Sequence, residues 1–400
     1  MKVLRNYLNK IKPDFEKGGK LSMFQSVFDG FETFLFVPNR TSKSGVHIHD
    51  SIDSKRTMSL VLVALTPALL FGMYNVGYQH NLATGLHSEW WMTFLFGFLA
   101  VLPKIVVSYT VGLGIEFTVA QWKKEEIQEG FLVSGMLIPM IVPVDTPLWM
   151  IAVATAFAVI FAKEVFGGTG YNVFNVALIT RVFLFFAYPS EMTVNVFVRT
   201  KSILGIGEGR VVDAFSSATP LGQIGTASQE AASAFQIVDV VGNPLTTWDY
   251  FIGLIPGSIG ETSMIAILIG AAILLFTGIA SWKIMVSIFT GGTVMALLFN
   301  LIGTTLFMTL SPIDHLFLGG FAFGAVFMAT DPVTSARTET GKYIYGFLIG
   351  ILAIMIRVLN PGYPEGMMLA ILFMNTFAPL IDYFVVNRNI KRRLKRVAVK

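Results

Sequence analysis

The sequence contains no cysteine and only five histidines among its 400 residues. Iron–sulfur clusters are held mainly by cysteine thiolates, and cysteine-rich zinc sites need the same ligands. The chain therefore cannot build either kind of centre from its own side chains. If it takes part in electron transfer, its redox centre is organic or belongs to a partner.

Charged residues are also scarce, at 14% of the chain, whereas hydrophobic residues make up 54%. The mean hydropathy is +0.66, which is too high for an ordinary soluble protein. An apolar membrane core of ~30 Å takes about 20 helical residues to cross, and many runs of this kind are present. We therefore predict an all-α polytopic membrane protein and not a β-barrel, whose strands are short and alternating.

Apolar runs between charges and Pro or Gly breaks predict about ten transmembrane helices. They are residues 57–77, 91–120, 131–144, 147–162, 173–188, 263–281, 284–303, 315–330, 343–358 and 366–386. Basic residues flank these runs on alternate sides, from Lys55 and Arg56 to the tail 387–400. Because basic residues favour the cytoplasmic side, both termini are predicted to be cytoplasmic, in a bacterial inner membrane.

Before the first run, residues 1–56 form a soluble arm without a cleavable signal segment. Its amphipathic stretch, 24–36, suits a membrane surface or a partner, and a flexible tail is the alternative. The other predicted units are a first membrane repeat at 57–188, an extracytoplasmic segment at 189–250, a second repeat at 251–386 and a basic tail at 387–400.

Two of the runs end in an acidic, proline-containing break, at residues 141–147 and 328–334. In the predicted topology these breaks lie on opposite faces of the membrane, one in each half of the chain. Residues 168–176 and 364–379 form a similar pair. The pattern favours two inverted five-helix repeats, with broken helices near the membrane midplane.

Residues 213–219, Asp-Ala-Phe-Ser-Ser-Ala-Thr, form a hydroxyl-rich turn in the polar segment between the repeats. The pattern D-x-x-S-x-A-T resembles the sequence at which flavin transferases join FMN to a threonine through a phosphoester. Thr219 is then the candidate anchor. The alternative is a polar turn that binds nothing.

Over nearly its whole length the chain resembles the NqrB/RnfD family of membrane subunits from ion-pumping oxidoreductases. The resemblance is carried by residues 50–56, 163–170, 251–261, 319–324, 327–333 and 360–372. It implies a urea- and ammonium-channel-like fold within a six-subunit Na+-translocating NADH:quinone reductase, a translocase. The long N-terminal arm favours this branch over the Rnf branch, whose members belong to ion-pumping ferredoxin:NAD oxidoreductases. The alternative outside the oxidoreductases is a passive channel of the urea or ammonium type.

The resemblance also implies two flavins. A covalent FMN is expected at Thr219, with Asp213, Ser216 and Ala218 as the transferase pattern, although Ser217 replaces the usual glycine. Riboflavin is expected beside Thr169, Asn172 and Asn175, although Val176 replaces a common proline. Asparagine at a broken helix is also often a helix cap, which is the alternative for the last two.

Gly112, Leu113 and Glu116 match the quinone region of the family. A buried, protonated carboxyl group could donate a hydrogen bond to a quinone carbonyl, whereas small residues there could serve only helix packing. Leu113 stands where the family has a second glycine.

Asp331 and Asp382 are the sodium candidates, with ordinary interfacial acids as the alternative. Arg357 is expected to pair with an acid such as Glu365.

The implied partners are five other subunits (A, C, D, E and F) with FMN, FAD and iron–sulfur clusters, a flavin transferase, quinone and Na+, with no nucleic acid.

Overall fold

In the computed structural model, the chain is helical. The structure describes residues 2–16, 18–36, 45, 54–123, 130–192, 197–212, 217–227, 235–360 and 362–398. Within these ranges there is no β-strand, only isolated bridges from Ile203 to Ile206 and from Val238 to Pro244. The all-α prediction is therefore confirmed for the described residues.

Six helices in this part of the chain are long and apolar enough to cross a membrane. They are α3 (Ser54–Thr84), α4 (Trp90–Lys123), α6 (Leu148–Ala162) with the 3-10 turn η2 (Glu164–Phe166), α11 (Trp282–Ile302), α15 (Glu339–Leu359) and α16 (Met367–Ala398). Three shorter apolar helices are α5 (Phe131–Ile141), α7 (Val176–Ala187) and α10 (Met264–Phe276). These nine segments overlap nine of the ten predicted runs, which supports a polytopic membrane protein.

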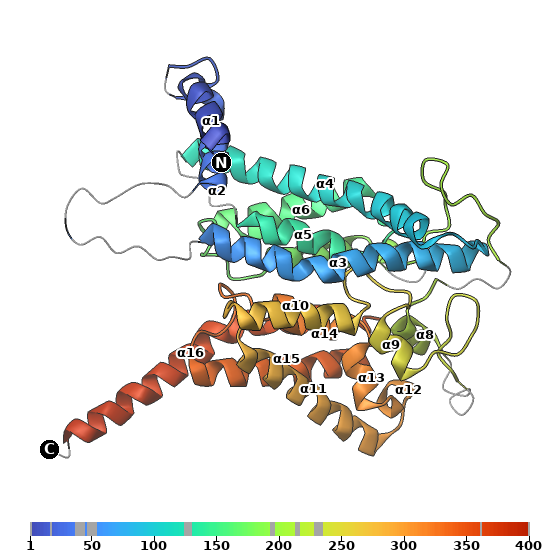
Figure 1. Cartoon of the computed structure of the whole chain (residues 1–400). Helices are drawn as coiled ribbons and strands as arrows, with labels where there is room; N and C mark the ends of the chain where they lie inside the picture. The colour runs from blue at the N-terminus through green and yellow to red at the C-terminus, as the bar shows by residue number, and fades with distance from the viewer. Residues whose placement is uncertain are drawn as a thin grey trace.

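The helices form two groups that lie side by side in Figure 1, one containing α3 to α6 and the other α10, α11, α15 and α16. Small residues allow helices to approach closely. A Cβ at Gly97 would lie 1.6 Å from the carbonyl oxygen of Met73, and one at Gly270 would lie 2.4 Å from that of Ala64. The second contact joins α10 to α3, and therefore one group to the other.

The predicted run at 315–330 is wrong as a single membrane span. The structure has two short helical pieces instead, α13 (Pro312–Phe317) and α14 (Phe321–Phe323) continued by the π-helix η5 (Gly324–Met328). Gly319 separates them with φ +65°, and a Cβ there would lie 2.7 Å from Leu221. Such a backbone is open to glycine and interrupts the helix.

Arg357 in α15 holds this interruption in place. Its guanidinium is fully buried and donates to the carbonyl oxygens of His315, Leu318 and Pro364. The expected pairing of Arg357 with Glu365 is therefore wrong, because its guanidinium donates hydrogen bonds to backbone carbonyls, two in the broken segment and one at Pro364 before α16.

The two predicted acidic breaks do interrupt helices. α5 ends at Ile141 and α6 starts after Pro147, and Lys104 of α4 donates to the carbonyl oxygen of Thr146 at 2.8 Å. The second break, around Asp331, follows η5.

The N-terminal arm contains α1 (Lys2–Phe15), the 3-10 turn η1 (Ser22–Phe24) and α2 (Gln25–Leu35), which lies within the predicted amphipathic stretch. Phe15 stacks on Phe28 at 4.8 Å, and Lys12 pairs with Glu32 at 2.7 Å. The arm is therefore a helical hairpin, which also contacts α4 through α2.

The segment 189–250 contains the 3-10 turn η3 (Pro189–Glu191) and α8 (Pro220–Thr226), and α9 (Thr247–Ile252) follows at its end. In Figure 1, α8 and α9 lie at the end of the helical bundle opposite α1 and α2, near the short α12 (Leu306–Thr309). His80 of α3 links this segment to the helical bundle. Its ring nitrogens Nδ1 and Nε2 lie 2.8 Å from the carbonyl oxygen of Arg199 and 3.0 Å from that of Gly207, respectively.

Candidate cofactor sites

A cavity of about 380 Å³, the anchor cavity, adjoins Thr219. Three aromatic side chains line it, those of Phe185, Phe197 and Tyr363. The rings of Phe185 and Tyr363 meet edge to face at 4.4 Å. Aromatic walls around a few polar groups are typical of sites for planar organic ligands.

Thr219 is the N-cap residue of α8. It has extended backbone before Pro220, as expected for a residue that precedes proline, and its Oγ1 accepts a hydrogen bond from Gly222 N at 3.1 Å. The side chain lines the anchor cavity and also a smaller cavity of about 20 Å³. The predicted anchor is thus held in a defined position on a cavity wall.

The rest of the predicted transferase pattern is only partly described. Ala218 lines the anchor cavity, whereas Asp213 and Ser216 lie outside the described residues. Ser217 is buried, and Leu204 is the one non-glycine residue with positive φ in the described part of the chain. Serine at this glycine position therefore carries no left-handed backbone strain.

A buried arginine, Arg181 of α7, forms the polar wall of the anchor cavity. It donates to Glu365, and its Nη1 lies 3.3 Å from Ser258 Oγ and 3.7 Å from Glu261 Oε1. Our reading of the sequence missed this cluster. A lone arginine within the apolar run 173–188 was the available signal, because charges inside membrane segments are rare.

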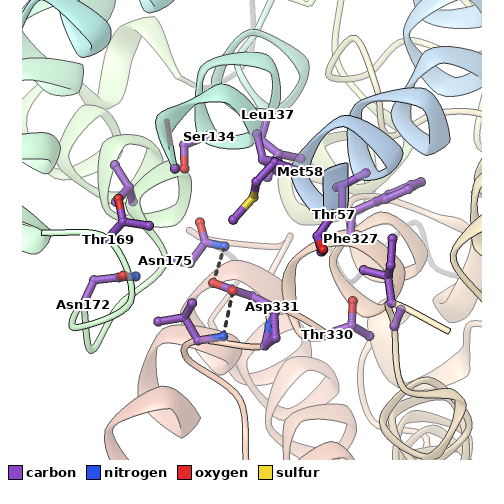
Figure 2. A pocket seen from close by; sticks show the side chains of 18 of the residues that line it. Thr57, Met58, Ser134, Leu137, Thr169, Asn172, Asn175, Phe327, Thr330 and Asp331 are labelled. Atoms are coloured by element: carbon purple, nitrogen blue, oxygen red, sulfur yellow. Dashed lines mark hydrogen bonds between the residues drawn. The ribbon is translucent and has the colours of Figure 1, made fainter. Parts of the chain in front are cut away.

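A second cavity, the polar cavity, has a volume of about 90 Å³ and is lined by residues from both groups of helices. In Figure 2, Thr169, Asn172 and Asn175 lie on one side of it and Asp331 and Thr330 on the other. The structure thus brings the three predicted riboflavin residues together with one of the two predicted sodium residues.

Asn175 has two roles at this cavity. Its Oδ1 caps α7 by accepting from the backbone N–H groups of Ala177 and Leu178, so the helix-cap interpretation is confirmed for this oxygen. Its Nδ2 turns toward Asp331 Oδ2 at 3.5 Å. Asn172 donates to the carbonyl oxygen of Phe174 at 3.0 Å.

The two predicted sodium residues lie in different places and both bind backbone N–H groups. Asp331 accepts from Val333 N at 3.0 Å and from the Thr334 hydroxyl at 3.1 Å. Asp382 accepts from Arg337 N at 2.7 Å and Thr338 N at 2.9 Å, and so ties α16 to the start of α15. The described residues contain no group of three or more His, Asp or Glu side chains suited to a metal ion.

The predicted quinone residues occupy one stretch of α4. A Cβ at Gly112 would lie 2.0 Å from the Phe131 ring, so this glycine allows α5 to pack against α4. Leu113 is half-buried against the core. Glu116 is buried and accepts a hydrogen bond from Lys163, which also lines the polar cavity.

Comparison with known proteins gives consistent results. A family model described as the NQR2, RnfD, RnfE family matches residues 41–391. The B subunit of the Na(+)-translocating NADH-quinone reductase of Chromohalobacter salexigens is 43% identical over 418 residues, covering 99% of this chain and 97% of the relative. The proteins of the same name from Ectopseudomonas mendocina and Azotobacter vinelandii are each 43% identical, covering 98% of this chain and 99% of the relative. The chain belongs to the NQR2, RnfD, RnfE family.

Proposed function

We propose that this chain is the flavin-carrying membrane subunit of a Na+-translocating NADH:quinone reductase. The full-length similarity to subunits of that name supports the assignment. Its role is to relay electrons from NADH toward quinone, coupled to Na+ export, together with the A, C, D, E and F subunits. A flavin transferase loads its FMN.

The observation that carries the proposal is the position of the Thr219 hydroxyl on the wall of the anchor cavity. The volume of about 380 Å³ lies in the range of small-molecule sites, roughly 300–1,000 Å³. Aromatic walls suit an isoalloxazine ring, and Arg181 Nε is buried there with no partner among the described residues. The residues therefore fit an FMN joined to Thr219.

In this assignment Thr219 fixes the phosphate end, Phe185 and Tyr363 exclude water, and Arg181, which is paired with Glu365 on the same wall, presents its guanidinium to the ligand. The bound flavin would supply one- and two-electron transfer. Asp213, Ser216 and Ala218 would serve recognition by the transferase.

Riboflavin is proposed for the polar cavity, held by Asn172, Asn175 and Thr169. At about 90 Å³ this cavity is smaller than a typical ligand site, so binding requires the lining side chains to move. Quinone is proposed beside Gly112, Leu113 and Glu116. Na+ is proposed to pass near Asp331 and Asp382.

The proposed topology places both termini in the cytoplasm of a bacterial cell and Thr219 on the outer side of the inner membrane. Supporting it, α8 lies opposite the arm and the basic end of α16 in Figure 1. The proposed inverted repeats pair α5 with the α14–η5 segment, because each is short and precedes an acidic, proline-containing break. A urea- or ammonium-type channel is favoured only by these broken helices.

A gel assay separates the two functions. The chain is co-expressed with a flavin transferase, denatured and examined for fluorescence that survives acid. We expect fluorescence in the native chain and in Thr226→Ala, whose threonine also lines the anchor cavity, and none in Thr219→Ala. A native chain without fluorescence would favour the channel.

A further inference from the structure

Three buried polar atoms near Thr219 have no hydrogen-bond partner among the described residues: Arg181 Nε, Tyr363 Oη and Glu261 Oε1. Buried polar groups are nearly always paired, because an unpaired group loses its hydration without compensation. Arg181 and Tyr363 line the anchor cavity, and Glu261 lines the smaller cavity next to it. Glu261 Oε1 lies 3.7 Å from Arg181 Nη1, so the two donors, Arg181 Nε and Tyr363 Oη, are the groups for which a ligand would supply the missing partners.

Arg181 is the only cationic side chain among the described residues that line the anchor cavity. Glu365 binds its Nη2, while Ser258 Oγ and Glu261 Oε1 lie 3.3 and 3.7 Å from its Nη1. These contacts fix the planar guanidinium from its far end and leave the Nε proton unused. The guanidinium is therefore held rigidly, and its Nε–H group remains available as a donor.

Tyr363 supplies a second donor on the same wall. Burial raises the pKa of the Tyr363 phenol, an effect larger than the opposite one of nearby Arg181, so the hydroxyl keeps its proton. Its ring packs edge to face on Phe185 at 4.4 Å, which limits where the hydroxyl can turn. Two donors thus face a cavity that also has the paired Glu365 carboxylate and aromatic side chains on its wall.

We infer that Arg181 and Tyr363 are positioning residues that bind the carbonyl and ring-nitrogen edge of the flavin at Thr219, and that Arg181 favours the reduced flavin. This inference rests on the proposed function. An isoalloxazine has one apolar edge and one polar edge that gains negative charge on reduction. The Arg181 guanidinium stabilises that charge through its unused Nε–H group, and the paired Glu365 carboxylate on the same wall weakens the effect without cancelling it.

The inference is tested on the full chain, co-expressed with a flavin transferase and purified in detergent. Two readouts are taken: covalent flavin by gel fluorescence and the flavin midpoint potential by spectroelectrochemical titration. Arg181→Gln removes the charge, and Tyr363→Phe removes one hydroxyl. We expect covalent flavin in both variants.

In Arg181→Gln the equilibrium should shift about tenfold toward the oxidised flavin, which equals about 59 mV more negative for a one-electron step. Tyr363→Phe should shift the potential in the same direction by less, and Arg181→Lys should lie between Arg181→Gln and the native chain. If Arg181→Gln does not fold, Arg181→Lys and Tyr363→Phe carry the test, because both variants keep the positive charge that pairs with Glu365.

Arg199→Gln is the matched control. Arg199 pairs with Asp145 at 3.2 Å and is absent from the residues that line the anchor cavity, so its loss should leave the potential unchanged. If both Arg181→Gln and Tyr363→Phe carry covalent flavin with the native midpoint potential, the inference is wrong but the proposed function stands. A shift in Arg199→Gln equal to that in Arg181→Gln would also contradict the inference. A native chain without covalent flavin would contradict both the inference and the proposed function.

Discussion

Lys163, at the end of α6, donates a hydrogen bond to Glu116 of α4, and both side chains are buried. Lys163 also lines the polar cavity with Asn172 and Asn175. The ion pair thus connects the predicted quinone region with the predicted riboflavin region. Glu116 Oε2 has no hydrogen-bond partner among the described residues and is left to accept from a hydroxyl group, whereas a carboxylate paired with Lys163 does not donate to a quinone carbonyl as the sequence suggested.

Glu116→Gln is expected to destabilise the protein by about 3–5 kcal/mol, because it leaves the Lys163 ammonium buried without its counter-charge. Adding Lys163→Met should recover most of that loss. Thermal unfolding in detergent measures both variants. A single variant as stable as the native chain would contradict the buried pair. A stable double variant that has lost quinone reduction in the complex would show that the pair also acts in electron transfer to quinone.

Gly112→Ala is expected to cost about 1–3 kcal/mol, because the added methyl group meets the Phe131 ring. Phe131→Leu in the same chain should relieve the clash and restore both stability and turnover. Turnover that stays low after stability has recovered would instead place quinone at this glycine.

Asn175→Ser is expected to keep the cap of α7, since serine is a good N-cap residue, and to lose the amide that faces Asp331. Asn175→Ala should lose both the cap of α7 and the amide, and the lost cap should lower the free energy of unfolding by about 1 kcal/mol. Extracted riboflavin should fall in both variants, with thermal unfolding reporting the cap. Native riboflavin content in Asn175→Ser would contradict a role for the amide in binding.

Asp382→Asn is expected to weaken the stimulation of turnover by Na+ in the assembled complex. It should also loosen the joint between α16 and α15, where Asp382 accepts from the backbone of Arg337 and Thr338. Asp314→Asn is the control, because Asp314 accepts from the Thr247 hydroxyl at 2.8 Å and should leave the Na+ response unchanged. An Asp382→Asn complex with the native Na+ response would make this acid purely structural.

The membrane helices could be predicted from sequence because hydropathy and proline act locally. Pro143 and Pro147 located the break after α5, and Asp331 with Pro332 located the one after η5. The run 315–330 was harder, because a glycine inside an apolar run does not reveal that it will adopt a positive φ, as Gly319 does at +65°.

Side-chain partners were mostly beyond the reach of sequence patterns. Arg181 and Glu365 are 184 residues apart, and only the packed fold selects this pair over Arg357 with Glu365. For the same reason the sequence, which made Asp382 a sodium candidate or else an ordinary interfacial acid, did not show that the start of α15 supplies its donors. Thr219 was predicted from a short motif, whereas its place on a cavity wall came from the fold.

Mass spectrometry of the peptide that contains Thr219 tests the central claim most directly. The full chain is co-expressed with a flavin transferase and digested, and the peptide mass and fragments are measured. The account predicts that the peptide gains the mass of one FMN less one water, with the added group on Thr219. An unmodified peptide, or FMN on Ser217 or Thr226, would contradict it.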